Sequence, residues 1–154
     1  MLCTPVDSGI AIRDNVHLAV TDAASGRIVQ RVSGHNTALS FSLDAFMQWL
    51  AGANNTGYNA LVAPAQMELG DGTGATFTPV AGTLKTISYT RYQGGGQMIA
   101  VAQWVASDPA GTFTQYQWQD VSGNPWFFFA PATAVSKTSA QNLTLQWTVT
   151  ATNG

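Results

Sequence analysis

The two histidines, His17 and His35, are the first side chains to examine for general-base or metal chemistry, because imidazole titrates near neutral pH and binds metals. His17 falls on the polar face of an alternating segment, and His35 falls in a break after it. Only Asp14 and Asp44 lie near them in sequence, and catalysis needs such partners within hydrogen-bonding distance. We therefore expect exposed or loop-bracing histidines, with no catalytic residue, no metal and no cofactor.

A glycine-rich segment at residues 70–74, Gly-Asp-Gly-Thr-Gly, has the superficial look of a phosphate-binding loop. It lacks the Lys-Ser/Thr ending of a P-loop, and no convincing helix follows it. It also lacks the acidic ligand series of a calcium loop. We predict instead that its glycines allow positive φ angles in a tight connection.

The carboxylates offer acid–base chemistry only if two of them meet, as in a glycosidase. Several fall at predicted turns, where aspartate bonds its own backbone, and nothing in the sequence singles out a pair. The carboxylates are Asp7, Asp14, Asp22, Asp44, Glu68, Asp71, Asp108 and Asp120. We do not expect an enzyme.

Aromatic side chains give the main alternative to a purely structural role, because an exposed row of them can stack against sugars. Tyr116 and Trp118 alternate with three glutamines over 115–119, which resembles such a surface locally, and they are the candidate ligand or interface aromatics. Trp104 and Trp147 occupy strand alternations that predict core or inter-sheet positions. From the sequence, both a carbohydrate platform and packing in the core or against another subunit stay open.

Alternating apolar residues predict strands along most of the chain. The clearest alternation is at 143–150, and the segment 97–106 is apolar on both faces, which indicates a central strand. Turns rich in Gly, Asp, Asn and Pro separate the strands. The predicted strands cover 10–20, 27–32, 65–69, 84–92, 97–106, 112–121, 126–130 and 143–150.

One segment has a helical period, because its apolar residues recur every three or four positions. These residues are Leu39, Leu43, Phe46, Met47 and Leu50. They predict a short α-helix near 38–51 in a chain that is otherwise mainly β. Short strands at roughly ten-residue spacing predict an antiparallel β-sandwich that is jelly-roll-like. Residues 1–9 lack periodicity and are predicted to be an N-terminal arm, and residues 10–154 are predicted to form a single domain.

The composition argues for a protein that works by contact rather than by catalysis. Only 9% of its 154 residues are charged, against roughly a quarter in an ordinary globular domain, while 45% are hydrophobic. Strands rich in Thr and Gln lack the charge that normally protects a monomer from edge-to-edge pairing. We therefore expect a homo-oligomer, with a trimer favoured over a dimer, or burial against a large partner.

The same composition argues against several classes of partner. The net charge is −2 and the four arginines and two lysines are scattered along the sequence, so we expect no nucleic acid. The longest apolar stretch, 125–131, is too short to span a membrane, and the first residues show no basic or apolar signal region. We therefore expect no membrane contact and maturation in a cytoplasm. Cys3 is the single cysteine, so no disulfide forms within the chain.

Three short motifs follow one another in a recognisable order. A predicted hairpin ends in Ser-Gly-His-Asn-Thr (33–37) and leads into the helix, and a strand closes in Leu-Gly-Asp-Gly-Thr-Gly (69–74). The last strand is preceded by Lys-Thr-Ser-Ala-Gln-Asn and reads Leu-Thr-Leu-Gln-Trp-Thr-Val-Thr (137–150 in all). This arrangement resembles small virion structural proteins of tailed bacteriophages over most of 16–150, although the connection at 75–82 is shorter than is usual in that family.

The resemblance implies a head decoration (cement) protein, or a small tail or baseplate component, without catalytic residues. A decoration protein binds the major capsid protein on the outside of the head and stabilises the shell. Its place is the virion, assembled in the host cytoplasm. A tail or baseplate component instead joins rings or fibres to other virion proteins. A carbohydrate-binding module for host attachment is the alternative from a different class.

Overall fold

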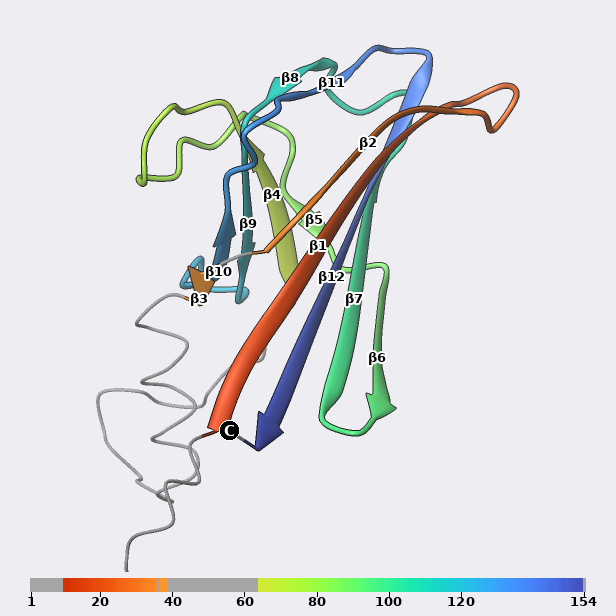
Figure 1. Ribbon diagram of the computed structural model, residues 1–154. Coiled ribbons are helices and arrows are strands. Elements are labelled where there is room, and N and C mark those ends of the chain that lie inside the picture. Colours follow the sequence, from red (N-terminus) through yellow and green to blue (C-terminus); the bar gives the residue numbers. More distant parts are fainter. Residues whose placement is uncertain (1–9, 36, 39–63, 154) are drawn as a thin grey trace, which may run out of the picture.

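The computed structural model describes residues 10–35, 37–38 and 64–153, and this part of the chain is mainly β with antiparallel sheets (Figure 1). The strands are β1 (Ile10–Asp22), β2 (Ile28–Gly34), β3 (Thr37–Ala38), β4 (Gln66–Gly70), β5 (Lys85–Thr86), β6 (Tyr89–Gly94), β7 (Gln97–Trp104), β8 (Gly111–Phe113), β9 (Gln115–Gln119), β10 (Pro125–Phe129), β11 (Val135–Lys137) and β12 (Gln141–Asn153). The expectation of a mainly β chain is confirmed.

Five strands form sheet A, in the order β2-β1-β12-β7-β6. Its longest pairing joins β1 to β12, in antiparallel register from Ile10 opposite Asn153 to Asp22 opposite Gln141. β12 pairs with β7 on its other side, and hairpins add β2 to β1 and β6 to β7. The strand predicted at 143–150 is therefore the middle strand of this sheet.

A second five-stranded sheet, sheet B, has the order β3-β10-β9-β4-β5. β9 and β10 form a hairpin at its centre, and β4 pairs with β9 on the side away from β10. β8 and β11 pair with each other as a separate two-stranded sheet at one end of the molecule (Figure 1).

One apolar cluster joins side chains from sheets A and B. The ring centroid of Trp118 on β9 lies 6.0 Å from that of Trp147 on β12 and 5.3 Å from that of Phe127 on β10. The buried hydrophobic residues are Val16, Leu18, Val20, Met67, Leu69, Ala100, Ala102, Trp104, Phe113, Tyr116, Trp118, Phe127, Phe129, Val135, Leu143, Leu145 and Trp147. Each large side chain in this set contributes about 1.5–3 kcal/mol when it leaves water.

β7 confirms the prediction of a central strand, because it is paired with β12 on one side and β6 on the other. The sequence left open which of its two apolar faces meets the other sheet. Ala100, Ala102 and Trp104 are buried in the apolar cluster, whereas Val105 is 42% exposed just after the strand. The indole Nε1 of Trp104 also donates to Thr83 O at 2.6 Å, which fixes the buried face.

The strand predicted over 84–92 is wrong as a single element. This stretch forms β5, which pairs with β4 in sheet B, and then β6, which pairs with β7 in sheet A. Ile87 N donates to Ala65 O, and Ser88 N donates to Val101 O, so the chain changes sheets between Ile87 and Ser88. The strand predicted over 112–121 is likewise divided into β8 and β9, which belong to different sheets. Only Ile87 and Ser88 separate β5 from β6, and only Thr114 separates β8 from β9, so the alternation in the sequence does not reveal the crossings.

The glycines at 70–74 are needed for a different reason from the predicted one. None of them has a positive φ. A Cβ on Gly70 would instead lie 2.6 Å from Thr78 O, and a Cβ on Gly72 would lie 2.6 Å from Gln115 Oε1. Real Cβ atoms do not approach other atoms so closely, so these positions need glycine for close packing.

The side chain of Gln115 holds this loop in place. Its Oε1 accepts from Thr78 N at 2.8 Å, and its Nε2 donates to Gly74 O at 2.8 Å and to Thr76 O at 2.9 Å. Gln115 is only 1% exposed, and these bonds use all the hydrogen-bonding groups that a buried amide must satisfy. The loop is therefore closed around a buried glutamine.

Parts of the predicted architecture are not settled by the described residues. The arm at 1–9 lies outside them, and so does the helix near 38–51 except for Ala38, which ends β3. The described residues contain no helix, and hence none long and apolar enough to cross a membrane. A jelly-roll connectivity is not confirmed, because β1–β2, β6–β7 and β9–β10 are hairpins within single sheets.

Candidate interaction surface

The face of sheet A turned away from the apolar cluster carries mostly uncharged polar side chains. Side chains alternate along a strand and cross-strand partners share a face, so the strand register fixes the members of this outer face. None of the residues that β1, β2, β7 and β12 place on it is a carboxylate. At its centre, β12 contributes a neutral ladder formed by Asn142, Thr144, Gln146, Thr148 and Thr150.

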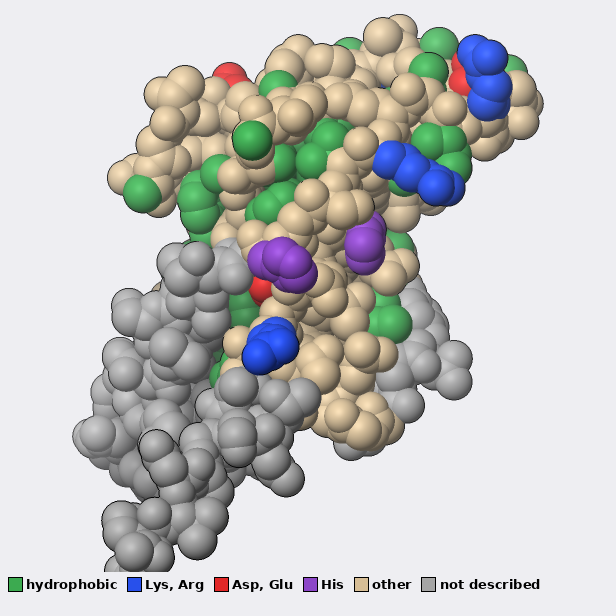
Figure 2. All heavy atoms as spheres, in the orientation of Figure 1, with side chains coloured by type: hydrophobic (Ala, Val, Ile, Leu, Met, Phe, Trp, Pro, Cys, Tyr) green, Lys and Arg blue, Asp and Glu red, His purple; other side chains and the backbone are tan. Residues whose placement is uncertain are grey.

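Three basic side chains lie on the β1–β2 side of this outer face. Arg13 and His17 lie on β1, and Arg31 lies on β2 opposite Ala19. All three are exposed, and we call them the basic margin. Figure 2 shows Lys/Arg and His side chains gathered along this side of the molecule. The β1–β2 hairpin places these three side chains on one margin, and Arg13 lies six residues along β1 from the position opposite Arg31.

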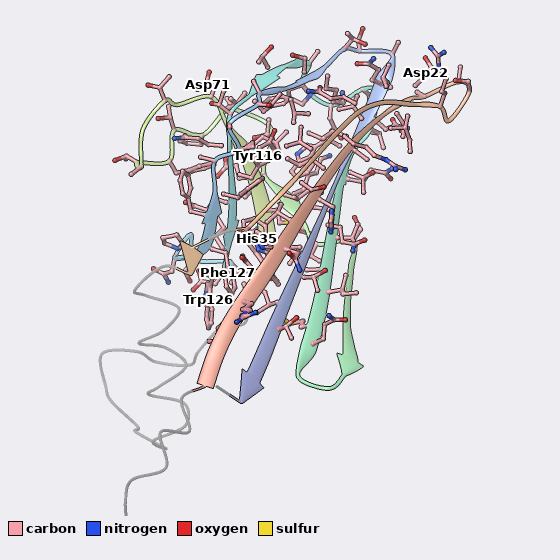
Figure 3. All side chains as sticks on the ribbon, viewed as in Figure 1. Asp22, His35, Asp71, Tyr116, Trp126 and Phe127 are labelled. Carbon is pink, nitrogen blue, oxygen red and sulfur yellow. The ribbon has the colours of Figure 1, made fainter. Side chains whose placement is uncertain are left out.

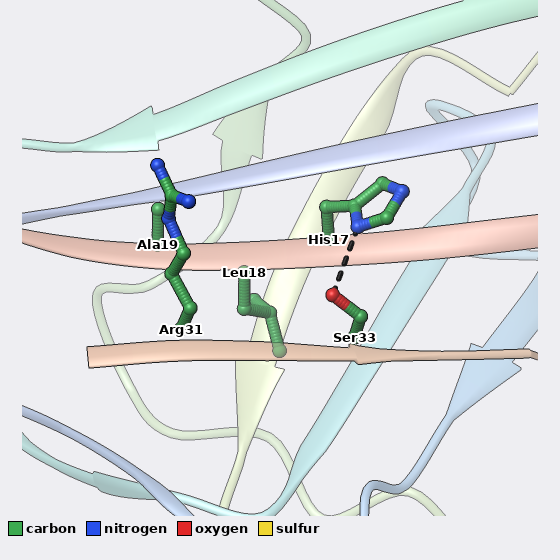
Figure 4. Close-up of a pocket in the computed structure, with 5 residues that line it drawn as sticks. All are labelled: His17, Leu18, Ala19, Arg31 and Ser33. Atoms are coloured by element: carbon green, nitrogen blue, oxygen red, sulfur yellow. Dashed lines mark hydrogen bonds between the residues drawn. The ribbon is translucent and has the colours of Figure 1, made fainter.

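A shallow, open pocket of about 310 Å³ lies on the basic margin (Figure 4). It is lined by His17, Leu18, Ala19, Arg31 and Ser33. Arg31 extends from β2 beside Ala19, and His17 Nδ1 lies 2.9 Å from Ser33 Oγ (Figure 4). The pocket thus has a guanidinium on one side and a hydrogen-bonded imidazole–hydroxyl pair on the other.

The ion pair found among the described residues lies away from this pocket. Lys85 Nζ is 2.6 Å from Asp108 Oδ1, and Val105 N donates to Asp108 Oδ2 at 2.8 Å. Burial acts to raise the pKa of Asp108, but these hydrogen bonds and the positive charges nearby hold that pKa below its usual value. Arg31 forms no ion pair with the described residues, and its side chain is exposed.

Lys137, the first residue of the closing motif, is a structural cation. It is 2% exposed, and its Nζ donates to Asp108 O at 3.0 Å, to Thr138 O at 3.4 Å and to Ala106 O at 3.5 Å. Burial lowers the pKa of this amine, and the carboxylate of Asp108 opposes that effect. Lys137 therefore ties the turn around Asp108 to the start of β12 and contributes no charge to the surface.

Both histidines are exposed and hydrogen-bonded, as expected. His35 lies beside β1, with its Nδ1 3.0 Å from Asp14 O (Figure 3). The Asp14 side chain is buried on the core side of β1, where its Oδ2 accepts from Trp147 Nε1 at 2.7 Å. Within the described residues, no group of three or more His, Cys, Asp or Glu side chains is placed to hold a metal ion.

The two candidate aromatics, Tyr116 and Trp118, lie in the core and are 0% exposed. Tyr116 Oη donates to Phe113 O at 3.2 Å, and burial raises the pKa of its phenol above the usual range. Figure 3 places Tyr116 and Phe127 on the strands of sheet B. In this position the pair does not provide the exposed row that sugar stacking requires.

The other face of β9 carries amide side chains that are also buried, next to aromatic side chains of neighbouring segments. Gln117 and Gln119 are buried there, and Gln117 Nε2 donates to Gln119 Oε1 at 2.6 Å. Phe128 of the adjacent β10 meets Phe77 edge to face, with centroids 6.4 Å apart. Glu68 on β4 lies opposite Gln117, and burial raises the pKa of its carboxyl. All five residues of β9 are buried, although the alternation of its glutamines with Tyr116 and Trp118 predicts one exposed face.

The basic margin could have been found from the sequence by one further step. Arg13 and His17 share a parity in the first predicted strand, and Arg31 falls in the returning strand of the same hairpin. Pairing those two strands places the three side chains on one face of the hairpin. No protein-family model, curated protein or solved structure matches the chain, so the functional proposal depends on this geometry and on the sequence motifs.

Proposed function

We propose that this chain is a virion structural protein of a tailed bacteriophage that decorates the outside of the capsid. The observation that carries the proposal is the outer face of sheet A, with its neutral ladder on β12 and no carboxylate at the described positions. Hydroxyl and amide side chains both donate and accept hydrogen bonds, so such a face suits extended contact with a protein surface. The order of the sequence motifs, which resembles such virion proteins, supports the same assignment.

The mechanism of a decoration protein is mechanical. The protein binds neighbouring copies of the major capsid protein and connects them, so that the shell resists internal pressure. Each contact is modest, but many contacts repeated around the shell act with an avidity that exceeds any single one. No cofactor and no chemical step belong to this role.

One edge of sheet A supports an oligomer as the working unit. The β2 edge is tied to the chain around β11 by the side chain of Gln30, whose Nε2 donates to Ala134 O at 2.9 Å and whose Oε1 accepts from Ser136 N at 3.1 Å. At the other edge, β6 has no further strand beside it among the described residues. Unpaired edge backbone favours association. We propose a homo-oligomer, with a trimer favoured over a dimer.

We also propose that the sheets form a β-sandwich. Sheets A and B share one apolar cluster, which supports a β-sandwich. A jelly-roll-like connection of the strands stays a prediction, and so does the short helix near 38–51.

Two other roles remain predictions. A tail or baseplate component would use the same neutral face to join rings or fibres, and its location in the virion by electron microscopy separates it from a decoration protein. A carbohydrate-binding module could not use Tyr116 and Trp118 to stack on sugars, since both side chains are in the core. It would have to use other aromatics, and Phe77 and Phe128 are the half-buried pair on the outer side of sheet B.

The test is binding to undecorated shells of the phage that encodes this chain. We expect the purified protein to sediment with the shells in a saturable ratio and to raise the temperature at which they break open. The double variant Thr144→Glu, Gln146→Glu places two carboxylates on the neutral ladder and should lose binding. Ser122→Glu, in an exposed turn, is the control and should keep it. Absence of binding by the unchanged protein contradicts the proposal.

A further inference from the structure

We propose that the pocket on the basic margin receives an acidic side chain, Asp or Glu, from the protein on which this chain docks. The inference rests on the proposed function and names the chemistry of the partner surface. Arg31 holds the incoming carboxylate, Ala19 leaves the space that the carboxylate enters, and the His17–Ser33 pair forms the far side of the pocket.

Arg31 is suited to this role because a guanidinium offers two parallel N–H donors to the two oxygens of a carboxylate. The side chain is exposed and lies in no ion pair of the described residues. The carboxylates nearest to it in sequence are occupied elsewhere or face the core. Asp22, at the tip of the hairpin, accepts from Ser25 N and Ser25 Oγ at 2.7 Å, and Asp14 is buried on the other face of β1.

The spacing along β1 leaves room for one carboxylate. His17 and Ala19 are two residues apart on the same face, a distance of about 7 Å along an extended strand. Arg31 lies opposite Ala19 and Ser33 lies opposite His17, so both sides of the pocket are set by the same register. The hydrogen bond of 2.9 Å between His17 and Ser33 holds the far side in place before a ligand arrives.

The arrangement favours a protein carboxylate over a nucleic acid. Arg13, the other arginine of the basic margin, is six residues from Ala19 along β1, which is about 20 Å. A nucleic-acid strand presents a charge every few ångströms and needs a denser row of cations. The surface between Arg13 and Arg31 carries Asn15, His17 and Ala19, and the adjacent ladder is neutral. A single acidic side chain set among polar neighbours complements this pattern.

Binding to immobilised poly-L-glutamate at low salt tests the pocket independently of any phage shell. We expect saturable binding that weakens as salt is added, since exposed charges are screened. Arg31→Ala should weaken it about tenfold or more, which is the scale of a lost charge-assisted hydrogen bond. Ala19→Leu fills the pocket without changing charge and should weaken it similarly. Arg27→Ala removes an exposed arginine outside the pocket, and binding should stay within about twofold of the unchanged protein.

Several outcomes would overturn the inference. One is absence of binding to poly-L-glutamate. Another is an equal loss in Arg27→Ala and Arg31→Ala, which would mean diffuse attraction rather than a pocket. A third is tighter binding to duplex DNA than to poly-L-glutamate, with the same dependence on Arg31, which would assign the pocket to phosphate.

The same variants on undecorated shells separate this inference from the proposed function. If the unchanged protein binds shells and Arg31→Ala binds equally well, the decoration role stands and the carboxylate pocket is wrong. If the unchanged protein does not bind shells but binds poly-L-glutamate through Arg31, the pocket stands and the decoration role is wrong. Loss of shell binding in Arg31→Ala and Ala19→Leu, with Arg27→Ala unaffected, supports both.

Discussion

Buried polar side chains stabilise turns and loops of this fold by hydrogen bonds to the backbone, and Lys137 is the clearest case. We predict that Lys137→Met lowers the free energy of unfolding by about 1–3 kcal/mol, because three backbone carbonyls lose their donor while the apolar part of the side chain is kept. Urea unfolding at neutral pH measures the change. Lys85→Met is the matched control, since it removes only the partly exposed ion pair with Asp108 and should cost about 0–1 kcal/mol. Equal costs in the two variants would contradict the structural role of Lys137.

The carboxyl of Glu68 is expected to make stability depend on pH in a specific direction. Burial raises its pKa in the folded protein above the usual 4.5. Between pH 4.5 and the folded pKa, the folded state therefore binds more protons than the unfolded state. The contribution to stability is therefore greatest below pH 4.5 and is lost as the pH rises through the folded pKa. We predict that Glu68→Gln removes this decline and makes the protein slightly more stable at neutral pH.

Two other carboxyls do not interfere with that measurement. Hydrogen bonds from Ser25 hold the pKa of Asp22 below its usual 3.8, and the pKa of Asp108 is also lowered. Their stabilising contributions are lost as the pH falls through those lowered values, which is below the range where Glu68 acts. The prediction is tested by measuring the unfolding temperatures of the unchanged protein and of Glu68→Gln at several pH values. Asp71→Asn, in an exposed loop, is the control. A parallel decline in both proteins would contradict the assignment.

At the level of elements, the glycine loop after β4 is fixed by close packing. We predict that Gly70→Ala costs about 1–3 kcal/mol of unfolding free energy, because its Cβ would lie 2.6 Å from Thr78 O. Gly74→Ala is the control in the same loop. The nearest atom to its Cβ is 3.9 Å away, and its φ is not positive, so alanine there should be neutral or slightly stabilising. Urea unfolding measures the free energy of unfolding of both variants. Equal losses would show that the loop does not need this close packing.

The strands show which parts of the fold a sequence can predict. β1, β7 and β12 follow from alternation, because each has one face in the apolar cluster and a regular partner on each side. The crossing at Ile87–Ser88 could not be predicted, since only these two residues separate β5 from β6 and neither is a glycine or proline that would mark a break. The burial of both faces of β9 could not be predicted either. Its glutamines alternate with aromatic residues as exposed residues would, but Gln115 is buried because its side chain binds the backbone of the glycine loop.

The candidate site needed the pairing of two predicted strands, a step beyond the local pattern of each strand. The pairing of β1 with β2 puts Arg31 opposite Ala19 and Ser33 opposite His17. The pocket also depends on Ala19, a small residue with no chemistry of its own, whose importance comes from lying opposite Arg31. Burial of Tyr116 and Trp118 likewise depends on a second sheet that local patterns do not describe.

For the whole molecule, the apolar part of the outer face of sheet A predicts how copies associate. We expect the subunit contact to lie where β7 contributes to this face. There, Ile99 and Val101 are half-buried and apolar, and Val105 is 42% exposed. Burying such groups between subunits is favourable, at roughly 25 cal/mol per Å² of apolar area.

We therefore predict that light scattering on a sizing column gives the mass of a trimer, or of a dimer, and that Val101→Glu shifts it towards the monomer. Val121→Glu is the control, because Val121 is 61% exposed in the turn between β9 and β10 and lies outside sheet A. Circular dichroism checks that both variants keep their β structure. A monomeric mass for the unchanged protein would mean that the unpaired edge and neutral face are covered only on the docking partner. Retention of the oligomer in Val101→Glu would place the subunit contact elsewhere, because a carboxylate without a partner in an interface core is strongly unfavourable.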